Sequence, residues 1–374
     1  MKKALFPILA AALMLSSCGL SEIKETISAK VDEKIEEHSI EKGSYTQEQV
    51  NEKIYNELAE CKRKIVFDGV VSTEMVQNAV YGARYARPDI FWTGGFTVST
   101  DYSTTTVECD SVHDLDEDAL AEMKADMDKS LDEVVKEASG GSTDFDKLLL
   151  IHDKLIEICD YDHAAAEASE SEDIGFAGSS YGCLVEHKAV CEGYAQAFAL
   201  AAQKMGFECG MVCGDAWIEN DKRYEKHAWN YVKVDGEYYW LDVTWDENTT
   251  ELESKYIPMH KFFMLDDSRF MKGRTVDEDV PFVPTCSSMD ENYYVKNGLF
   301  LDSYSFDQVN SLMNEHFKDG GFDIMFADRD SYDEAIDDLM KNGNIWNTDI
   351  MQGGVENAPY YADPELCILT ISPE

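Results

Sequence analysis

Basic residues are scarce in this sequence of 374 residues. It has 32 lysines and arginines against 74 aspartates and glutamates, and its formal net charge at pH 7 is -42. A surface of that charge repels phosphate backbones and anionic lipid headgroups, so the composition argues against nucleic acid as a partner. The acidic residues are spread along the chain rather than gathered in one block, which is typical of a solvated surface.

Long apolar runs are absent after the first residues. No later stretch approaches the roughly 18 apolar residues that a helix needs to cross a bilayer. No segment matches an EF-hand loop, a phosphate-binding glycine loop or a dinucleotide fingerprint. Cys209 and Cys213 lack a second Cys or His pair, and His187 also has no partner at metal-site spacing. The sequence therefore predicts no cofactor and no metal, and it places His187 on the surface.

The first residues have the three parts of an export signal. Two lysines precede an apolar run at residues 4–15, and two small serines precede Cys18. The segment LSSC that ends at Cys18 resembles the lipobox of bacterial lipoproteins. The resemblance implies cleavage before Cys18 and a lipid on its sulfur, so we expect an extracytoplasmic chain anchored to the bacterial cell membrane by that lipid.

Composition divides the chain into five regions, and 44% hydrophobic residues are enough to fill several cores. Residues 19–43 are highly charged and contain neither an aromatic residue nor a proline, which indicates a stalk. The predicted regions are a signal peptide at 1–17, the stalk at 18–45, an N-terminal α/β region at 46–112, a central domain at 113–285 and a small α/β domain at 286–374.

Apolar periodicity predicts the elements of the first regions. Helices are expected at 46–64, 117–137 and 143–159, and Ser72 is a predicted N-cap of a further helix that Pro88 ends. Threonine, valine and tyrosine make residues 91–109 β-rich.

The last region alternates predicted strands and helices. Strands are expected at 293–301 and 322–327, with strand-like segments around Ile345 and Leu366. A helix that bears Phe306, Val309, Met313 and Phe317 on one face, and another at 331–342, complete the predicted α/β pattern.

A helical pattern surrounds Cys191. Apolar residues repeat at three- and four-residue steps through 188–207, and Gly206 fits the end of the helix. At a helix start, unpaired backbone N–H groups favour a thiolate over a thiol and can donate to an oxyanion. The small Gly193 and Ala195 are expected to leave room for a substrate. Cysteines at helix starts also occur as plain packing, so Cys191 needs partners to indicate chemistry.

Those partners come from a predicted hairpin at 226–247, where Asp-Gly separates two aromatic and β-branched runs. If Val234 pairs with Glu237, His227 and Asp242 lie on one face as diagonal neighbours, about 7 Å apart, within reach of side-chain contact. A slip of one residue would move one of them to the other face.

These three residues together match the needs of thiol chemistry. A thiol at a helix start needs a base to take its proton, and a carboxylate keeps a histidine in the right tautomer and stabilises its charged form. Alone, His227 fits a core or surface histidine equally well, and Asp242 fits a turn or a salt bridge. In combination, Cys191, His227 and Asp242 are predicted as nucleophile, base and orienting residue.

Three segments that occur in order resemble motifs of the transglutaminase-like superfamily: AVCEGYA around Cys191, HAWNYV from His227 and YYWLDVTWD around Asp242. The resemblance covers about residues 144–246. It implies an α+β, papain-like core in which the Cys helix packs on an antiparallel sheet that bears the His and the Asp. It also implies acyl transfer through a thioester, and the three residues match the family's triad positions one by one. Tyr181 is a candidate side-chain oxyanion donor, and a buried packing role fits it equally well.

The expected activity is hydrolysis of peptide or isopeptide amide bonds in proteins or cell-wall peptides. Two alternatives stay open, namely a protein-crosslinking transglutaminase and a non-catalytic binding or scaffold lipoprotein with the same fold. Trp229, Trp240 and Trp245 fit either a core or the lining of an acyl-group cleft.

Overall fold

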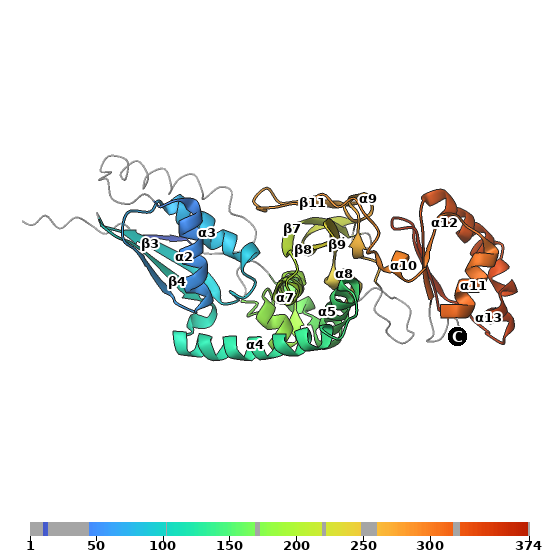
Figure 1. The fold of residues 1–374 in the computed structure, drawn as a ribbon, viewed down its shortest axis with the longest axis horizontal. Helices are drawn as coiled ribbons and strands as arrows, with labels where there is room; N and C mark the ends of the chain where they lie inside the picture. The colour runs from blue at the N-terminus through green and yellow to red at the C-terminus, as the bar shows by residue number, and fades with distance from the viewer. Residues whose placement is uncertain are drawn as a thin grey trace, which may run out of the picture. The chain divides into compact units, whose positions relative to one another are not determined.

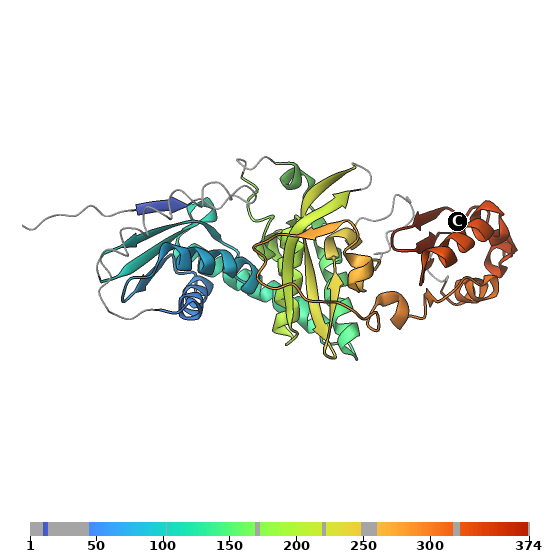
Figure 2. The same cartoon turned by 90° about the horizontal axis from the view of Figure 1, so that it is seen from above.

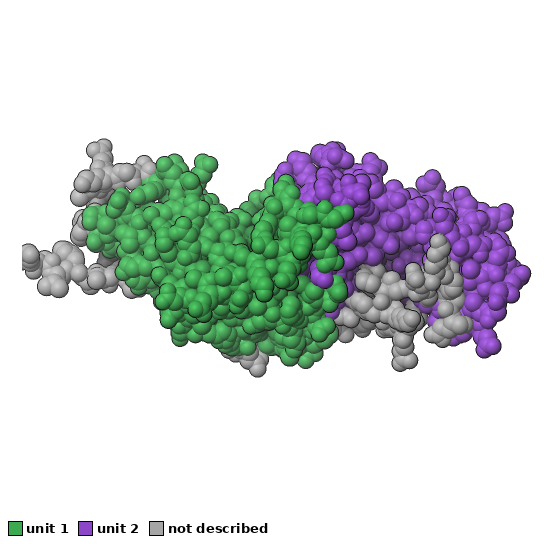
Figure 3. All heavy atoms as spheres, turned by 60° about the horizontal axis from the view of Figure 1, so that its bottom comes forward, with its two compact units in different colours: residues 1–140, 157–206, 279–282 green, residues 141–156, 207–278, 283–374 purple. Residues whose placement is uncertain are grey.

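The computed structural model describes residues 10–13, 45–101, 103–168, 173–218, 222–247, 260–316 and 322–372. The chain forms two compact units (Figure 3). Unit 1 comprises Met1–Gly140, Glu157–Gly206 and Asp279–Phe282, and unit 2 comprises Gly141–Ile156, Phe207–Glu278 and Val283–Glu374. Cys18, almost all of the predicted stalk and most of the predicted signal peptide lie outside the described residues.

Unit 1 contains a four-stranded antiparallel sheet in the order β1-β3-β4-β2, with two helices against it (Figures 1 and 2). Its β4 alternates between buried and exposed residues, as expected for a sheet with one covered face. The edge strand β1 lies within the predicted signal peptide, so a processed chain would lack it. The elements are β1 (Ala10–Leu13), β2 (Lys64–Phe67), β3 (Thr93–Thr100), β4 (Thr105–Ser111), α2 (Gln47–Ala59) and α3 (Thr73–Ala86).

The helix starts of this region follow their capping residues. Thr46 and Gln49 form a reciprocal capping box at α2, and the Ser72 hydroxyl accepts from the Met75 N–H at the start of α3. The last residue of α3 is Ala86, because a residue before Pro88 is disfavoured in the helical region. The predicted helices and the β-rich segment are thus confirmed.

The remainder of unit 1 carries the Cys191 helix. The long helix α4 (Glu117–Ala138) buries one apolar face and contacts α7 (Cys191–Lys204), as Figure 1 shows. A parallel pair of two-residue strands, β5 (Asp160–Tyr161) and β6 (Lys188–Ala189), and a π-helical turn (Gly182–Glu186) precede α7. The pattern predicts a helix over 188–207, and the observed helix begins three residues later, at Cys191.

Unit 2 contains a five-stranded antiparallel sheet in the order β10-β9-β8-β7-β11. Val234 pairs with Glu237, and Asp235 and Gly236 both have positive φ, as a type I′ turn requires. The predicted hairpin register is thus confirmed. The elements are α5 (Asp144–Ile158), β7 (Cys209–Ile218), β8 (Arg223–Val234), β9 (Glu237–Leu241), α8 (Val243–Glu247), β10 (Phe263–Leu265), α9 (Asp267–Phe270) and β11 (Arg274–Val276). The last two residues of α5 belong to unit 1.

A second sheet of unit 2 has the order β12-β13-β15-β14, with one parallel and two antiparallel pairs. Its elements are β12 (Phe300–Leu301), α11 (Phe306–His316), β13 (Phe322–Phe326), α12 (Arg329–Ala335), a π-helical turn (Ile336–Lys341), α13 (Asp349–Gln352), β14 (Tyr360–Asp363) and β15 (Ile368–Ile371).

Two strand predictions in this region are wrong. Residues predicted as a strand at 293–301 form the short helix α10 (Tyr293–Lys296), and only Phe300–Leu301 is a strand. The Asn292 side chain caps that helix by accepting from the Tyr294 N–H, and this local bond overrides the β-propensity of the tyrosines. Ile345 lies in a 3-10 helix (Asn344–Asn347) instead of a strand.

Within the described parts of the chain, no helix combines the length and the apolar character needed to cross a membrane.

Candidate active site

Cys191 is the first residue of α7. The preceding residue, Val190, has an extended backbone and supplies no side-chain cap, so the N–H groups of the first turn are not occupied by a capping side chain. Of the nine described cysteines, Cys191 is partly exposed and the other eight are buried. The position therefore combines access with the positive end of a helix dipole, two conditions for a reactive thiolate.

The residue after Cys191 is tied to the N-terminal region. Arg84 of α3 binds Glu192 through two parallel hydrogen bonds of 2.5 and 2.6 Å. Gln196 donates to Glu192 at 3.1 Å and accepts from the Ser180 N–H at 3.3 Å. The Arg84 charge offsets a carboxylate that would otherwise oppose a neighbouring thiolate, and the bidentate geometry holds the first turn of α7 in place.

The prediction that Gly193 leaves room for a substrate is wrong. A Cβ atom at this position would lie 2.6 Å from the Ala177 carbonyl oxygen and 2.9 Å from that of Ser179. Glycine is required here because the chain at 177–179 packs directly on the backbone of α7. The Val190 N–H donates to the same Ala177 oxygen at 2.9 Å, which fixes this close approach.

Replacing Gly193 with alanine is therefore expected to lower the free energy of unfolding of unit 1 by about 1–3 kcal/mol, the usual effect of overpacking a close contact. Thermal or urea unfolding would measure the change. Gly178→Ala is the matched control, since its new Cβ would meet only the Ile174 side chain, at an ordinary 3.7 Å. Equal stability of the two variants would contradict this packing role.

Tyr181 is buried among aromatic rings. Its ring stacks on Phe91 with centroids 5.1 Å apart and contacts Phe176 at the same separation. Burial raises the pKa of Tyr181, with smaller contributions from Asp126 and Glu186, so its hydroxyl stays protonated at neutral pH. A packing role is evident from these contacts, and the role as an oxyanion donor stays a prediction. His187 is exposed, in agreement with its predicted surface position.

His227 and Asp242 meet in unit 2 as the hairpin register predicts. His227 Nε2 lies 2.8 Å from Asp242 Oδ2. The strand β9 ends at Leu241, directly before Asp242, and the chain then turns into α8. The turn into α8 lets Asp242 Oδ1 accept from the Trp245 N–H at 3.1 Å, and the His227 ring stacks on Trp245 with centroids 4.7 Å apart.

Arg274 is a third member of this arrangement that sequence reasoning missed. Its Nη2 donates to Asp242 Oδ2 at 2.9 Å, and its Nη1 donates to the Phe270 carbonyl at 2.8 Å. The guanidinium lies 4.0 and 4.1 Å from the ring centroids of Trp245 and Phe270. The buried Asp242 carboxylate thus lies between His227 and a buried, aromatic-packed arginine.

The electrostatics keep Asp242 ionised. Burial alone would raise the pKa of Asp242, but His227 and then Arg274 outweigh it and hold the pKa below its usual value. An ionised carboxylate on Nε2 favours a proton on that nitrogen. Any proton exchange between His227 and a thiol would then use Nδ1.

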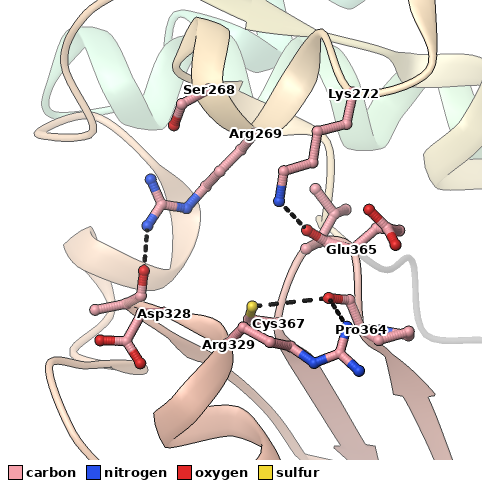
Figure 4. A pocket seen from close by; sticks show the side chains of 10 residues that line it. Ser268, Arg269, Lys272, Asp328, Arg329, Pro364, Glu365 and Cys367 are labelled. Carbon is pink, nitrogen blue, oxygen red and sulfur yellow. Dashed lines mark hydrogen bonds between the residues drawn. The ribbon is translucent and has the colours of Figure 1, made fainter.

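A cavity lies elsewhere in unit 2 (Figure 4). Arg269, Lys272 and Arg329 line it together with residues of the loop 364–367. Their head groups donate to backbone carbonyls of the lining, at distances of 2.6 to 3.3 Å. Because its basic groups are engaged in this way and its lining contains none of the predicted triad residues, the cavity supplies no part of the candidate active site.

Comparison with family models supports the family suggested by the motifs. The family model described as the transglutaminase-like superfamily matches residues 132–244. A solved structure of a TGase is similar at 15% identity and a TM-score of 0.29, over 54% of this chain and 55% of that one. A candidate cysteine protease from Cytophaga hutchinsonii is similar at 13% identity and a TM-score of 0.26, over 54% of this chain and 77% of that one. The chain therefore spans about half the length of the first structure. A search of the curated proteins finds no match.

The chain contains a domain of the transglutaminase-like superfamily, and its fold is a mixture of helices and sheets, as predicted. Cys191, His227, Asp242 and Tyr181 all lie inside the matched residues, whereas Arg274 lies 30 positions beyond their end.

Proposed function

We propose that the protein is a thiol acyl-transfer enzyme in which Cys191 is the nucleophile, His227 its base and Asp242 the residue that orients the base. The observation that carries the proposal is the buried His227–Asp242 pair, with 2.8 Å between Nε2 and Oδ2, inside the residues that match the family model. An imidazole held by a carboxylate can accept and donate the protons that acyl transfer requires. The position of Cys191 at the start of α7, in unit 1, is a second observation in favour of the proposal.

The proposed reaction has two steps. The Cys191 thiolate attacks an amide carbonyl, the C–N bond breaks, and the amine leaves with a proton from His227, which forms a thioester. Water then attacks the thioester, His227 takes a proton from it, and the carboxylic acid and the thiol are released. N–H groups of the first turn of α7, with Tyr181 as the proposed side-chain donor, would stabilise the oxyanion of each step.

The proposed setting is outside the cytoplasmic membrane. The LSSC segment supports a lipid on Cys18, and that setting offers protein and cell-wall peptides as substrates. Hydrolysis is preferred over crosslinking because water is always present, whereas an amine acceptor must compete with it.

Product analysis tests the proposal. The purified chain would be incubated with glutamine-bearing, isopeptide-bearing and cell-wall stem peptides, with and without a labelled primary amine, and the products identified by mass. We expect a hydrolysed amide in both conditions, a thioester at Cys191 that hydroxylamine releases, and no product from Cys191→Ala. An amine adduct that replaces the acid would indicate a transglutaminase. Failure to turn over or acylate with any of these peptides would favour the binding or scaffold role.

A further inference from the structure

Unit 2 holds a second histidine–carboxylate cluster that the proposed reaction does not use. His152 and Asp153 are neighbours on α5, Asp246 lies on α8, and His260 precedes β10. His152 Nδ1 lies 2.9 Å from Asp153 Oδ1, and His260 Nε2 lies 2.7 Å from the same oxygen. His152 and Asp246 are wholly buried, and His260 is almost so.

Two imidazole nitrogens and one carboxylate oxygen converge at this point. One ligand atom from each of His152, Asp153 and His260 lies within 4.8 Å of the others. In a tetrahedral zinc site with metal–ligand bonds of about 2.0–2.2 Å, neighbouring ligand atoms are about 3.4 Å apart. The two printed separations, 2.9 and 2.7 Å, are shorter than that spacing, and the third lies within 4.8 Å, so small side-chain shifts would bring the three atoms to it.

The Asp246 carboxylate orients His152 through the ring nitrogen that faces away from Asp153. His152 Nε2 lies 3.1 Å from Asp246 Oδ2, and the other oxygen of Asp246 accepts from the Phe262 N–H at 3.0 Å. Histidines that bind a metal through one nitrogen commonly donate the other N–H to a carboxylate in this way. The His260 ring is held as well, since it stacks on Tyr293 with centroids 4.1 Å apart.

We propose that His152 Nδ1, Asp153 Oδ1 and His260 Nε2 bind one divalent transition-metal ion of the zinc type, with Asp246 as the carboxylate that orients His152. Two imidazoles favour such an ion over Ca²⁺ and Mg²⁺, which prefer oxygen ligands. The ion takes no part in the proposed acyl-transfer steps.

The metal would bear on the His227–Asp242 pair through α8. The Asp246 N–H donates to the Asp242 carbonyl oxygen at 3.2 Å, in the first turn of that helix. An ion that fixes His152 against Asp246 therefore holds the short helix that Asp242 directly precedes. The proposed role of the ion is structural, because the four side chains of the cluster join α5, α8 and the segment before β10.

Metal binding to the chelator-treated full chain tests the site. Zn²⁺ and, separately, Co²⁺ would be titrated in buffer with millimolar Mg²⁺, which occupies weak sites on the acidic surface. We expect one equivalent of Zn²⁺ by calorimetry and visible absorption bands of four-coordinate cobalt. His260→Gln should remove the bands, Asp246→Asn should weaken Zn²⁺ binding about 10- to 100-fold, and the exposed His163→Ala should change neither.

A hydrogen-bonded cluster without a metal function predicts a different result. It gives no stoichiometric Zn²⁺ binding under these conditions, or binding that His260→Gln leaves unchanged, and either outcome overturns the proposal. The cobalt spectrum of the wild-type chain needs no variant. Its absence at one equivalent decides against the site even if a variant fails to fold.

Discussion

Replacing His227 with alanine is expected to lower kcat/KM by about 10²- to 10⁴-fold, the range for loss of a general acid–base residue. The same variant should slow alkylation of Cys191 by iodoacetamide near neutral pH, since the thiolate loses its proton acceptor. Labelling measured by intact mass from pH 5 to 9 tests the pair without knowledge of the substrate. His227→Gln keeps most of the side-chain volume and should behave like His227→Ala.

Selective labelling is expected because of how the other thiols are placed. All eight other described cysteines are buried, and burial raises the pKa of Cys109, for example, to about 12. Cys191→Ala should therefore remove the rapid label altogether. Equal labelling rates for wild type and His227→Ala across the pH range would show that His227 does not activate Cys191, and the binding role would then be preferred.

Much of the site was predictable because its signals are local. An Asp-Gly turn between alternating strands fixes the register of β8 and β9, and the contact between His227 and Asp242 follows from that register alone. The helix around Cys191 was predictable from its periodicity, but the pattern placed its start three residues before Cys191, where α7 begins. Where one element or one hairpin determines a geometry, the pattern of residue types is sufficient.

The missed features depend on contacts that no local pattern encodes. Arg274 reaches Asp242 from a strand 32 positions away, and His260 meets Asp153 across 107 positions. Neither spacing resembles a motif. Gly193 was misinterpreted for a related reason, since the backbone at 177–179 that packs on it belongs to a different segment.

Methionine in place of Arg274 is expected to lower the free energy of unfolding of unit 2 by about 3–5 kcal/mol. The reason is that Asp242 would keep its buried charge with one partner fewer, and uncompensated buried charges destabilise by that amount. Methionine preserves much of the apolar contact with Trp245 and Phe270, so the loss of stability reports mainly on the missing positive charge. Adding Asp242→Asn to this variant should restore part of the stability, because the amide has no charge to compensate.

The same substitution should also change the response to acid. The pKa of Asp242 is lowered in the folded chain, so its contribution to stability is full above the ordinary aspartate pKa near 3.9 and is lost as pH falls through the lower folded value. Without Arg274 the burial effect has less opposition and the pKa of Asp242 rises. The gap between the unfolded and the folded pKa then shrinks, so the variant should lose less stability than the wild type as the pH falls. Urea unfolding from pH 7 to 3, followed by tryptophan fluorescence, would measure both effects. Lys64→Met is the control, because the exposed Lys64–Glu108 pair should contribute at most about 1 kcal/mol, and an Arg274→Met chain no less stable than this control would contradict the role of Arg274.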